Sequence, residues 1–187
     1  MAVIAKSVEG GLSIGADEVE VVVARDQGLE VSVRQGGIEN LELSNDRSLS
    51  VSLLFGKRKG SASSTNFDDS SIKSLLAKAK DLSLLLQEDP YYGLAPGELS
   101  PQKIIEMDLD HPWITEPSDA VEIALNIERA GLSLDKRVLK SDSAGVSTIK
   151  SLVGYGNSNG FSAVVPSSRH SISSVFVAEQ KDGMQRD

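Results

Sequence analysis

Hydrophobic and polar residues alternate through much of the first third of the chain. In "LEVSVRQ" (29–35) and "SLSVSLLF" (48–55), apolar residues occupy every second position. This alternation is typical of antiparallel strands with one buried face. Turn-forming residues interrupt it at 26–28, 36–37, 44–46 and 56–57. The pattern therefore predicts a meander of four or five strands between Val19 and Thr65, the last being "GSASST".

The apolar spacing then changes, twice, to that of an amphipathic helix. We predict one helix from about Ile72 to Leu86, capped at Asn66, Asp68 or Ser70 and ended by Pro90. A second helix is predicted to begin at Pro117, because proline suits the first helical turn. The apolar stripes that support these helices are Ile72, Leu75, Leu76, Ala79, Leu82 and Leu86 in the first, and Ala120, Ile123, Ala124, Ile127, Ala130 and Leu134 in the second.

Three β-rich runs follow the second helix: "VSTIKSLVGY", "GFSAVV" and "HSISSVFVAE". Asn159-Gly160 lies between the first two. An Asn-Gly pair between β-rich runs predicts a hairpin with a type I′ turn, in which both central residues have positive φ. We therefore expect Asn159-Gly160 at a hairpin tip, with Arg169 and His170 on the strand that follows.

These elements predict an α+β protein of two units, each with a helix packed on a mostly antiparallel sheet. The first unit is expected at 1–89 and the start of the second at 117–187, where the chain ends. Residues 90–116 are expected to form a linker, because they hold four of the six prolines and show little periodicity.

Composition narrows the functional classes. The formal net charge is −8, and no basic run is longer than Lys57-Arg58-Lys59, so we expect no direct contact with nucleic acid. The chain has no cysteine, which excludes disulfides and thiolate metal sites. No apolar run approaches the roughly 20 residues needed to span a bilayer. We expect a cytoplasmic protein with no membrane contact.

No complete catalytic or metal site is visible in the sequence. The two histidines, His111 and His170, belong to no His-x-x-x-His or His-Glu-x-x-His motif. No Gly-x-Ser-x-Gly turn is present, and "GKRKGSASST" lacks the end of a phosphate-binding loop. We therefore expect no catalytic residue and no metal ligand in this chain.

Four polar residues near the predicted hairpin remain as candidates for binding. They are Asn157, Asn159, Arg169 and His170. Polar groups on neighbouring strands can converge on one face, and an outer strand can accept an extended peptide as an added strand. The hypothesis is a polar surface that meets a partner or a peptide. A solvated hairpin without a binding role is the alternative.

Several of these stretches, taken in order, resemble the TldD/PmbA family, and specifically its PmbA (TldE) branch, known as "modulator of DNA gyrase". The resemblance begins with the region "VSVRQGGIENLELSNDRSLSVSLLFGKRKGSASST" and the helix after it. It continues through "DPYYGLA", "DLDHP", "LDKRV" and "GNSNG…SSRHSISSVFVAEQKDGMQRD", and covers about Asp17 to Asp187. Because members of the family are more than twice as long, the resemblance implies an N-terminal portion.

The resemblance also implies a function. Family members form a TldD–PmbA heterodimer that processes peptides, with a His-Glu-x-x-x-His zinc motif in the TldD branch, outside the region that this chain resembles. It follows that this chain carries no cofactor and no catalytic residue, and that zinc is expected only in a TldD-like partner. The expected partners are that subunit and a peptide substrate.

Three functions remain open at this stage. The first is a non-catalytic subunit of a metallopeptidase, which serves assembly and peptide capture. The second is a stand-alone protein-interaction module that acts on a partner such as DNA gyrase. The third is an enzyme whose site the motifs do not reveal, so whether the chain is an enzyme stays undecided.

Overall fold

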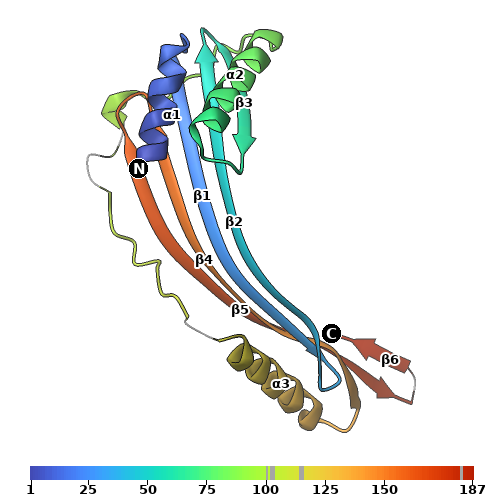
Figure 1. Cartoon of the computed structure of the whole chain (residues 1–187). Helices are drawn as coiled ribbons and strands as arrows, with labels where there is room; N and C mark the ends of the chain where they lie inside the picture. The colour runs from blue at the N-terminus through green and yellow to red at the C-terminus, as the bar shows by residue number, and fades with distance from the viewer. Residues whose placement is uncertain (100, 102–103, 114–115, 182) are drawn as a thin grey trace. The chain divides into compact units, whose positions relative to one another are not determined.

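The protein is a sheet with helices packed on it. The computed structural model describes residues 1–99, 101, 104–113, 116–181 and 183–187. The strands of these residues form one antiparallel sheet in the order β3-β2-β1-β4-β5-β6, which confirms the predicted α+β class (Figure 1). The elements are α1 (Ala2–Ser13), β1 (Glu18–Arg34), β2 (Gly37–Phe55), β3 (Arg58–Ser64), α2 (Asp69–Leu85), the 3-10 helix η1 (Gly97–Leu99), α3 (Pro117–Leu134), β4 (Val138–Asn157), β5 (Ser162–Gln180) and β6 (Gly183–Arg186).

The chain divides into two compact units that are interleaved along the sequence. Unit 1 comprises Met1–Arg25, Asp46–Asp108 and Ser151–Pro166, and unit 2 comprises Asp26–Asn45, Leu109–Lys150 and Ser167–Asp187. The units differ from the consecutive segments 1–89 and 117–187, because β1, β2, β4 and β5 each contribute residues to both units. No helix among the described residues is long and apolar enough to cross a membrane.

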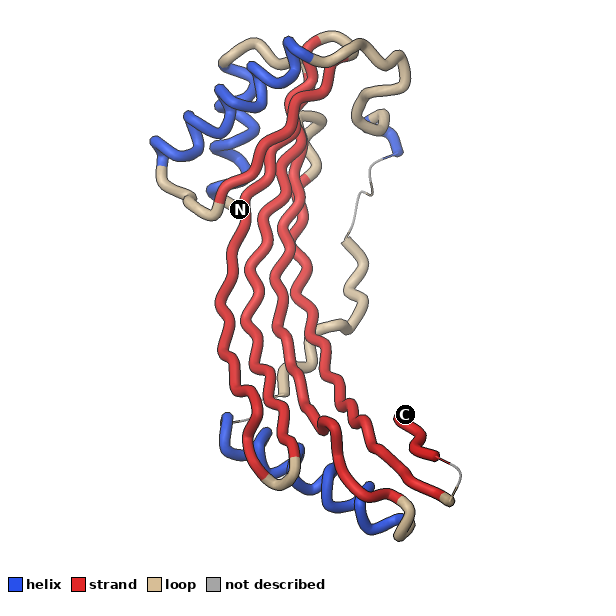
Figure 2. Tube along the Cα trace, turned by 90° about the vertical axis from the view of Figure 1, so that its right-hand side faces the viewer, coloured by secondary structure: helices blue, strands red, loops and turns tan. Residues whose placement is uncertain are grey.

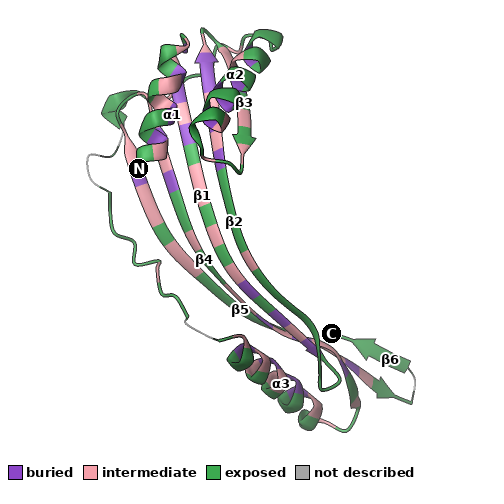
Figure 3. Cartoon of the chain, in the orientation of Figure 1, coloured by how far each residue is buried: buried purple, intermediate pink, exposed green. Residues whose placement is uncertain are grey.

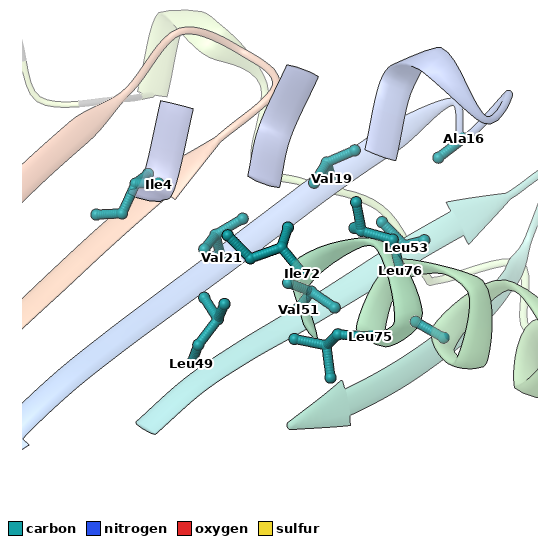
Figure 4. Close-up of a cluster of buried hydrophobic side chains, with 11 residues drawn as sticks. Ile4, Ala16, Val19, Val21, Leu49, Val51, Leu53, Ile72, Leu75 and Leu76 are labelled. Carbon is teal, nitrogen blue, oxygen red and sulfur yellow. The ribbon is translucent and has the colours of Figure 1, made fainter. Parts of the chain in front are cut away.

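The core of unit 1 lies between the sheet and the helices α1 and α2. Apolar residues of β1 and β2 meet both helices in this core (Figure 4). The helix α2 matches the prediction and starts at the cap Asp68, whose side chain accepts a hydrogen bond from the Ser71 N–H. The sequence pattern did not predict α1, which buries only Ile4, Ser7 and Gly11. The buried residues of the core are Ile4, Ala16, Val19, Val21, Leu49, Val51, Leu53, Ile72, Leu75, Leu76 and Ala79.

The helix α2 also packs closely on β3. A Cβ atom added at Gly60 of β3 would overlap the Ala79 carbonyl oxygen and lie 2.6 Å from the Ser83 backbone nitrogen. The small residues of this strand therefore allow the helix backbone to approach it closely.

The core of unit 2 lies between the sheet and α3, which lies across the strands (Figures 1 and 2). The helix begins at Pro117 as predicted, with Glu116 as its N-cap residue. Its buried residues are Ala120, Ala124, Glu128 and Gly131, so the buried stripe is narrower than the predicted apolar one and includes a carboxylate. The predicted stripe residues Ile123 and Ile127 are half-buried at its side.

The predicted meander was wrong in its number of strands. Residues 26–28 and 44–46 do not form turns, because β1 and β2 continue through them. Gly28 and Ser44 lie close together on these strands, and a Cβ atom at Gly28 would lie 2.6 Å from the Ser44 Oγ. A glycine within a strand often marks such an approach, which explains why the turn signal misled the prediction.

The turn expected at 36–37 lies one residue earlier, at Gln35-Gly36, and the turn expected at 56–57 is confirmed. Gln35 and Gly36 both have positive φ, of 52° and 78°, as a type I′ turn requires. Residues Gly56 and Lys57 separate β2 from β3, whose strands pair from Phe55↔Arg58 to Leu49↔Ser64.

The hairpin at Asn159-Gly160 is confirmed, but its turn type was predicted wrongly. Only Gly160 has positive φ (86°), the Gly160 N–H donates to the Asn157 carbonyl, and the Asn157 N–H donates to the Phe161 carbonyl. This is the pattern of a three-residue loop that ends in a left-handed glycine. The runs "GFSAVV" and "HSISSVFVAE" belong to one strand, β5, instead of two.

Candidate functional site

Asn157 organises the tip of the β4–β5 hairpin in unit 1. Its Oδ1 accepts hydrogen bonds from the backbone N–H of Asn159 (3.0 Å) and of Phe161 (3.2 Å). An asparagine side chain that bonds the backbone two residues later is typical of turns. The side chain of Asn157 therefore stabilises the loop, which places Asn159 at its tip.

The tip and neighbouring strand ends of unit 1 hold the segment that follows α2. Side chains bond to the backbone of this segment. Asn159 Nδ2 donates to the Ala95 carbonyl (2.9 Å), and Lys57 Nζ donates to the Tyr92 carbonyl (2.7 Å). The Leu94 N–H donates to Glu18 Oε2 (2.7 Å). Bonds to backbone atoms fix the path of the segment and depend little on which side chains it carries. Asn159 thus binds the protein's own linker.

A polar network in the same unit connects β1, β3 and β4. The Tyr155 hydroxyl donates to Glu20 Oε1 (3.1 Å), and Lys59 Nζ lies 3.2 Å from Glu20 Oε2. Asn157 Nδ2 lies 3.4 Å from the Tyr155 hydroxyl. Burial raises the pKa of the Tyr155 phenol, and the nearby Glu20 carboxylate adds to the rise. The phenol therefore stays protonated near neutral pH and serves as a hydrogen-bond donor.

His170 makes the corresponding contact with the linker in unit 2. Its Nε2 lies 2.8 Å from the His111 carbonyl oxygen, and its Nδ1 lies 2.8 Å from Thr148 Oγ1. Since a carbonyl can only accept, Nε2 carries the hydrogen of this bond. The Trp113 ring meets the imidazole edge to face, with ring centroids 5.9 Å apart. Both ring nitrogens are therefore engaged within the chain.

The four candidate residues divide between the two units. Asn157 and Asn159 belong to unit 1, whereas Arg169 and His170 belong to unit 2. Arg169 and His170 are neighbours on β5, and successive strand residues point to opposite faces of the sheet. The Arg169 side chain makes no hydrogen bond or ion pair with the part of the chain that the structure describes.

The described residues form no cluster of side chains suited to a catalytic zinc ion. Zinc in proteins takes three or four ligands from His, Cys, Asp and Glu. The chain has two histidines and no cysteine, and the ring nitrogens of His170 bind Thr148 and His111. Among residues 1–99, 101, 104–113, 116–181 and 183–187, no three side chains of these types come together as a possible metal site. We derive no catalytic step through zinc here.

The sequence pattern missed the buried carboxylate that holds the β1–β2 turn. Glu128 of α3 is 2% exposed, and its two oxygens accept the backbone N–H groups of Gln35 and Gly36, each at 2.7 Å. A signal was present, because Glu128 continues the i, i+4 spacing of the buried residues Ala120 and Ala124. An acidic residue in such a stripe indicates a buried hydrogen-bond acceptor.

Known families match both parts of the chain. A model described as PmbA/TldA metallopeptidase domain 1 matches residues 19–83, and one described as PmbA/TldA metallopeptidase central domain matches residues 110–187. The chain is 35% identical to "Metalloprotease PmbA" of Escherichia coli O157:H7 over 172 residues, which is 92% of this chain and 38% of that protein. It is 33% identical to "Metalloprotease PmbA homolog" of Haemophilus influenzae over 181 residues, which is 97% of this chain and 40% of that protein.

Solved structures share the fold. A putative modulator of DNA gyrase from Bacteroides thetaiotaomicron superposes with a TM-score of 0.88 at 18% identity, over 99% of this chain and 42% of that one. TldE from Thermococcus kodakarensis superposes with a TM-score of 0.79 at 20% identity, again over 99% of this chain and 42% of that one.

The chain thus spans about two-fifths of the length of the relatives that it matches. Two domain models of one family match it in order, together over most of its length, and relatives named PmbA align with nearly all of it. The chain belongs to the PmbA/TldD family of metallopeptidase-like proteins.

Proposed function

We propose that this chain acts as the PmbA/TldE-type, non-catalytic part of a two-subunit metallopeptidase that processes peptides in the cytoplasm. Its role is assembly and peptide capture, and a TldD-like subunit supplies the zinc. Membership of the PmbA/TldD family supports the reaction class.

One observation carries the non-catalytic part of the proposal. Both ring nitrogens of His170 hold contacts within the chain, to Thr148 and to the His111 backbone. To bind zinc, the imidazole would have to give up one of these hydrogen bonds, and with it a contact that holds the linker on β5. The chain's own chemistry therefore favours a structural role for this histidine.

The test combines this chain with a TldD-like protein from the same genome. We expect a stoichiometric complex by size-exclusion chromatography with light scattering, and cleavage of an unstructured fluorogenic peptide that a zinc chelator abolishes. This chain alone should retain no stoichiometric zinc and cleave nothing.

Two results would contradict the proposal. The first is stoichiometric zinc with peptide cleavage by this chain alone, which would make it a catalytic subunit. The second is no complex with the TldD-like protein together with a stable complex with gyrase subunits, which would favour an interaction module.

A further inference from the structure

One edge of the sheet in unit 2 has no neighbouring strand among the described residues. β3 pairs only with Leu49–Phe55, so residues 37–45 of β2 have β1 on one side and no described strand on the other. We name residues 37–45 the edge segment. Its side chains are exposed, apart from the half-buried Ser44 (Figure 3). About half of its backbone N–H and C=O groups point away from β1, because these groups alternate in direction along a strand.

The opposite edge of the same unit is covered by the chain itself. The Ser168 N–H of β5 donates to the Leu109 carbonyl (2.8 Å), and the His111 N–H donates to Ser168 Oγ (2.8 Å). Further along β5, residues Val177–Gln180 pair with β6. Unit 2 therefore covers one edge of its sheet and leaves the edge segment open.

The edge segment lacks several of the usual devices that protect an open edge, although it carries Glu39 and Glu42. Lysine, proline and short strand length are common devices against unwanted pairing, and the nine residues "GIENLELSN" contain neither Lys, Arg nor Pro. Their large apolar side chains are well exposed: Ile38 by 57%, Leu41 by 43% and Leu43 by 67%. The segment thus combines a backbone edge that no described strand pairs with and exposed apolar side chains, which is what strand addition uses.

The charge of the edge segment selects the kind of strand that it can accept. Its charged residues are Glu39 and Glu42. Glu39 lies 3.4 Å from Arg34, whereas Glu42 makes no ion pair with any described residue. A second copy of this chain would set two such acidic segments against each other, in a protein of net charge −8. A strand with basic side chains is the complementary occupant.

The β1–β2 hairpin that carries the edge segment is held in a fixed conformation. Glu128 accepts the N–H groups of Gln35 and Gly36 at the hairpin turn, directly before the segment. A preorganised strand loses less conformational freedom when a peptide pairs with it.

We propose that the edge segment captures an extended peptide in which lysine or arginine alternates with apolar residues, and that this peptide adds as a strand beside β2. The inference deepens the proposed peptide capture and rests on that function for its biological purpose. Backbone pairing supplies affinity for any extended chain, and Glu42 with the exposed leucines sets the preference for basic and apolar side chains.

The test uses the full chain without any partner and a fluorescein-labelled nine-residue peptide that alternates lysine with valine or threonine. One comparison peptide carries glutamate in place of lysine. The other carries N-methyl groups on its three central amides, and these methyl groups block both edges of the peptide strand. By fluorescence anisotropy at about 150 mM salt, we expect the lysine peptide to bind about tenfold more tightly than either comparison peptide. Hydrogen exchange should show that it protects amides within residues 37–45.

A matched pair of variants locates the site. Glu42→Lys should weaken binding of the lysine peptide about tenfold, whereas Glu122→Lys on an exposed position of α3 makes the same change of net charge and should leave binding within about twofold. Equal losses in both variants, or equal binding of the N-methylated peptide, would overturn the proposal. Sedimentation showing that the chain dimerises with residues 37–45 protected in the absence of peptide would also overturn it.

This experiment separates the two proposals. If the lysine peptide fails to bind while the complex with a TldD-like protein still forms and cleaves peptides, only the edge inference fails.

Discussion

Glu128 is a buried residue of a type that is usually exposed to water. A carboxylate removed from water is costly unless it is hydrogen-bonded. Here both of its oxygens are used, because Gln35 and Gly36 direct consecutive backbone N–H groups at the side chain. The pair forms because both residues have positive φ, a conformation that turns adjacent amides toward one side. One helix side chain thus fixes the turn between two strands.

Replacing Glu128 should therefore destabilise the protein strongly. We expect Glu128→Ala to lower the free energy of unfolding by about 3 kcal/mol, because two amides that had a charged acceptor lose it. Urea denaturation followed by circular dichroism measures the change. Glu122→Ala, on an exposed position of the same helix, serves as the control and should cost less than about 0.5 kcal/mol. Similar losses in both variants would contradict the assigned role.

At the scale of elements, the helices depend on specific contacts at their ends. The helix α2 starts at Asp68, whose carboxylate accepts bonds from Ser70 Oγ (2.6 Å), the Ser71 N–H (2.9 Å) and Ser71 Oγ (2.8 Å). These bonds lower the pKa of Asp68 from the ordinary 3.8 to about 2, and the bond from Ser70 Oγ has the largest effect. The cap therefore favours the ionised carboxylate.

The contribution of this cap should depend on pH. Because the pKa is lower in the folded state, the stabilisation is complete above the ordinary value of 3.8 and is lost as the pH falls toward about 2. We expect Asp68→Ala to melt several degrees below the unmodified protein at pH 6, and this difference to narrow steadily between pH 4 and pH 2. Thermal unfolding at a series of pH values measures it. A difference that is constant with pH would show that the ionised side chain is not the cap.

The linker is a second element that depends on a few contacts. In unit 2, His170 holds the backbone of His111, and the same ring meets Trp113. These contacts join a segment with little secondary structure to β5. The segment is also held by its bonds to Ser168 and by the ion pair between Asp110 and Lys150.

Removing the imidazole should loosen this segment locally. We expect His170→Ala to speed amide hydrogen exchange severalfold in residues 109–113, because both a hydrogen bond and a ring contact are lost. Arg169→Ala is the matched control, since its neighbouring side chain makes no hydrogen bond or ion pair within the described part of the chain. Exchange that is unchanged in His170→Ala, or changed equally in both variants, would contradict the assignment.

At the scale of the whole molecule, the net negative charge is the opposite of the basic surface typical of nucleic-acid-binding proteins. The net charge is −8. The longest basic run is Lys57-Arg58-Lys59, and each of its side chains contacts another residue of the same chain. Lys57 donates to the Tyr92 carbonyl, Lys59 pairs with Glu20 and Arg58 pairs with Glu88. The three cations of this run are thus already engaged within the chain.

We therefore expect no measurable binding to duplex or single-stranded DNA. Phosphate contacts require clustered cations that release counterions, and an acidic surface repels the backbone instead. Fluorescence anisotropy with a labelled 30-base duplex at about 0.15 M salt should show no change with micromolar protein. Saturable binding that weakens as salt is added would show that a basic surface exists after all.

Several features follow from the sequence alone, because local chemistry decides them. Alternation placed strands at "LEVSVRQ" and "SLSVSLLF", and helical spacing placed α2 and α3. The start of α3 at Pro117 was predicted, whereas Asp68 was one of three candidate caps for α2. The α+β class follows from these elements. Hairpin turns near 36–37 and at 159–160 also follow, because glycine tolerates the positive φ that Gly36 and Gly160 adopt.

The remaining features were decided by the tertiary structure, since they depend on contacts between residues far apart in sequence. A glycine in a strand pattern can indicate either a turn or a close approach of another residue. At Gly28 it marks a close approach, because Ser44 lies beside it in the folded sheet. The linker atoms that His170 and Asn159 bind are backbone carbonyl oxygens, which the pattern of side chains does not predict. The open edge of β2 results from where β3 stops pairing, and strand order is a property of the whole sheet. Local sequence therefore determined what each segment becomes, whereas packing determined which segments meet and which edge stays open.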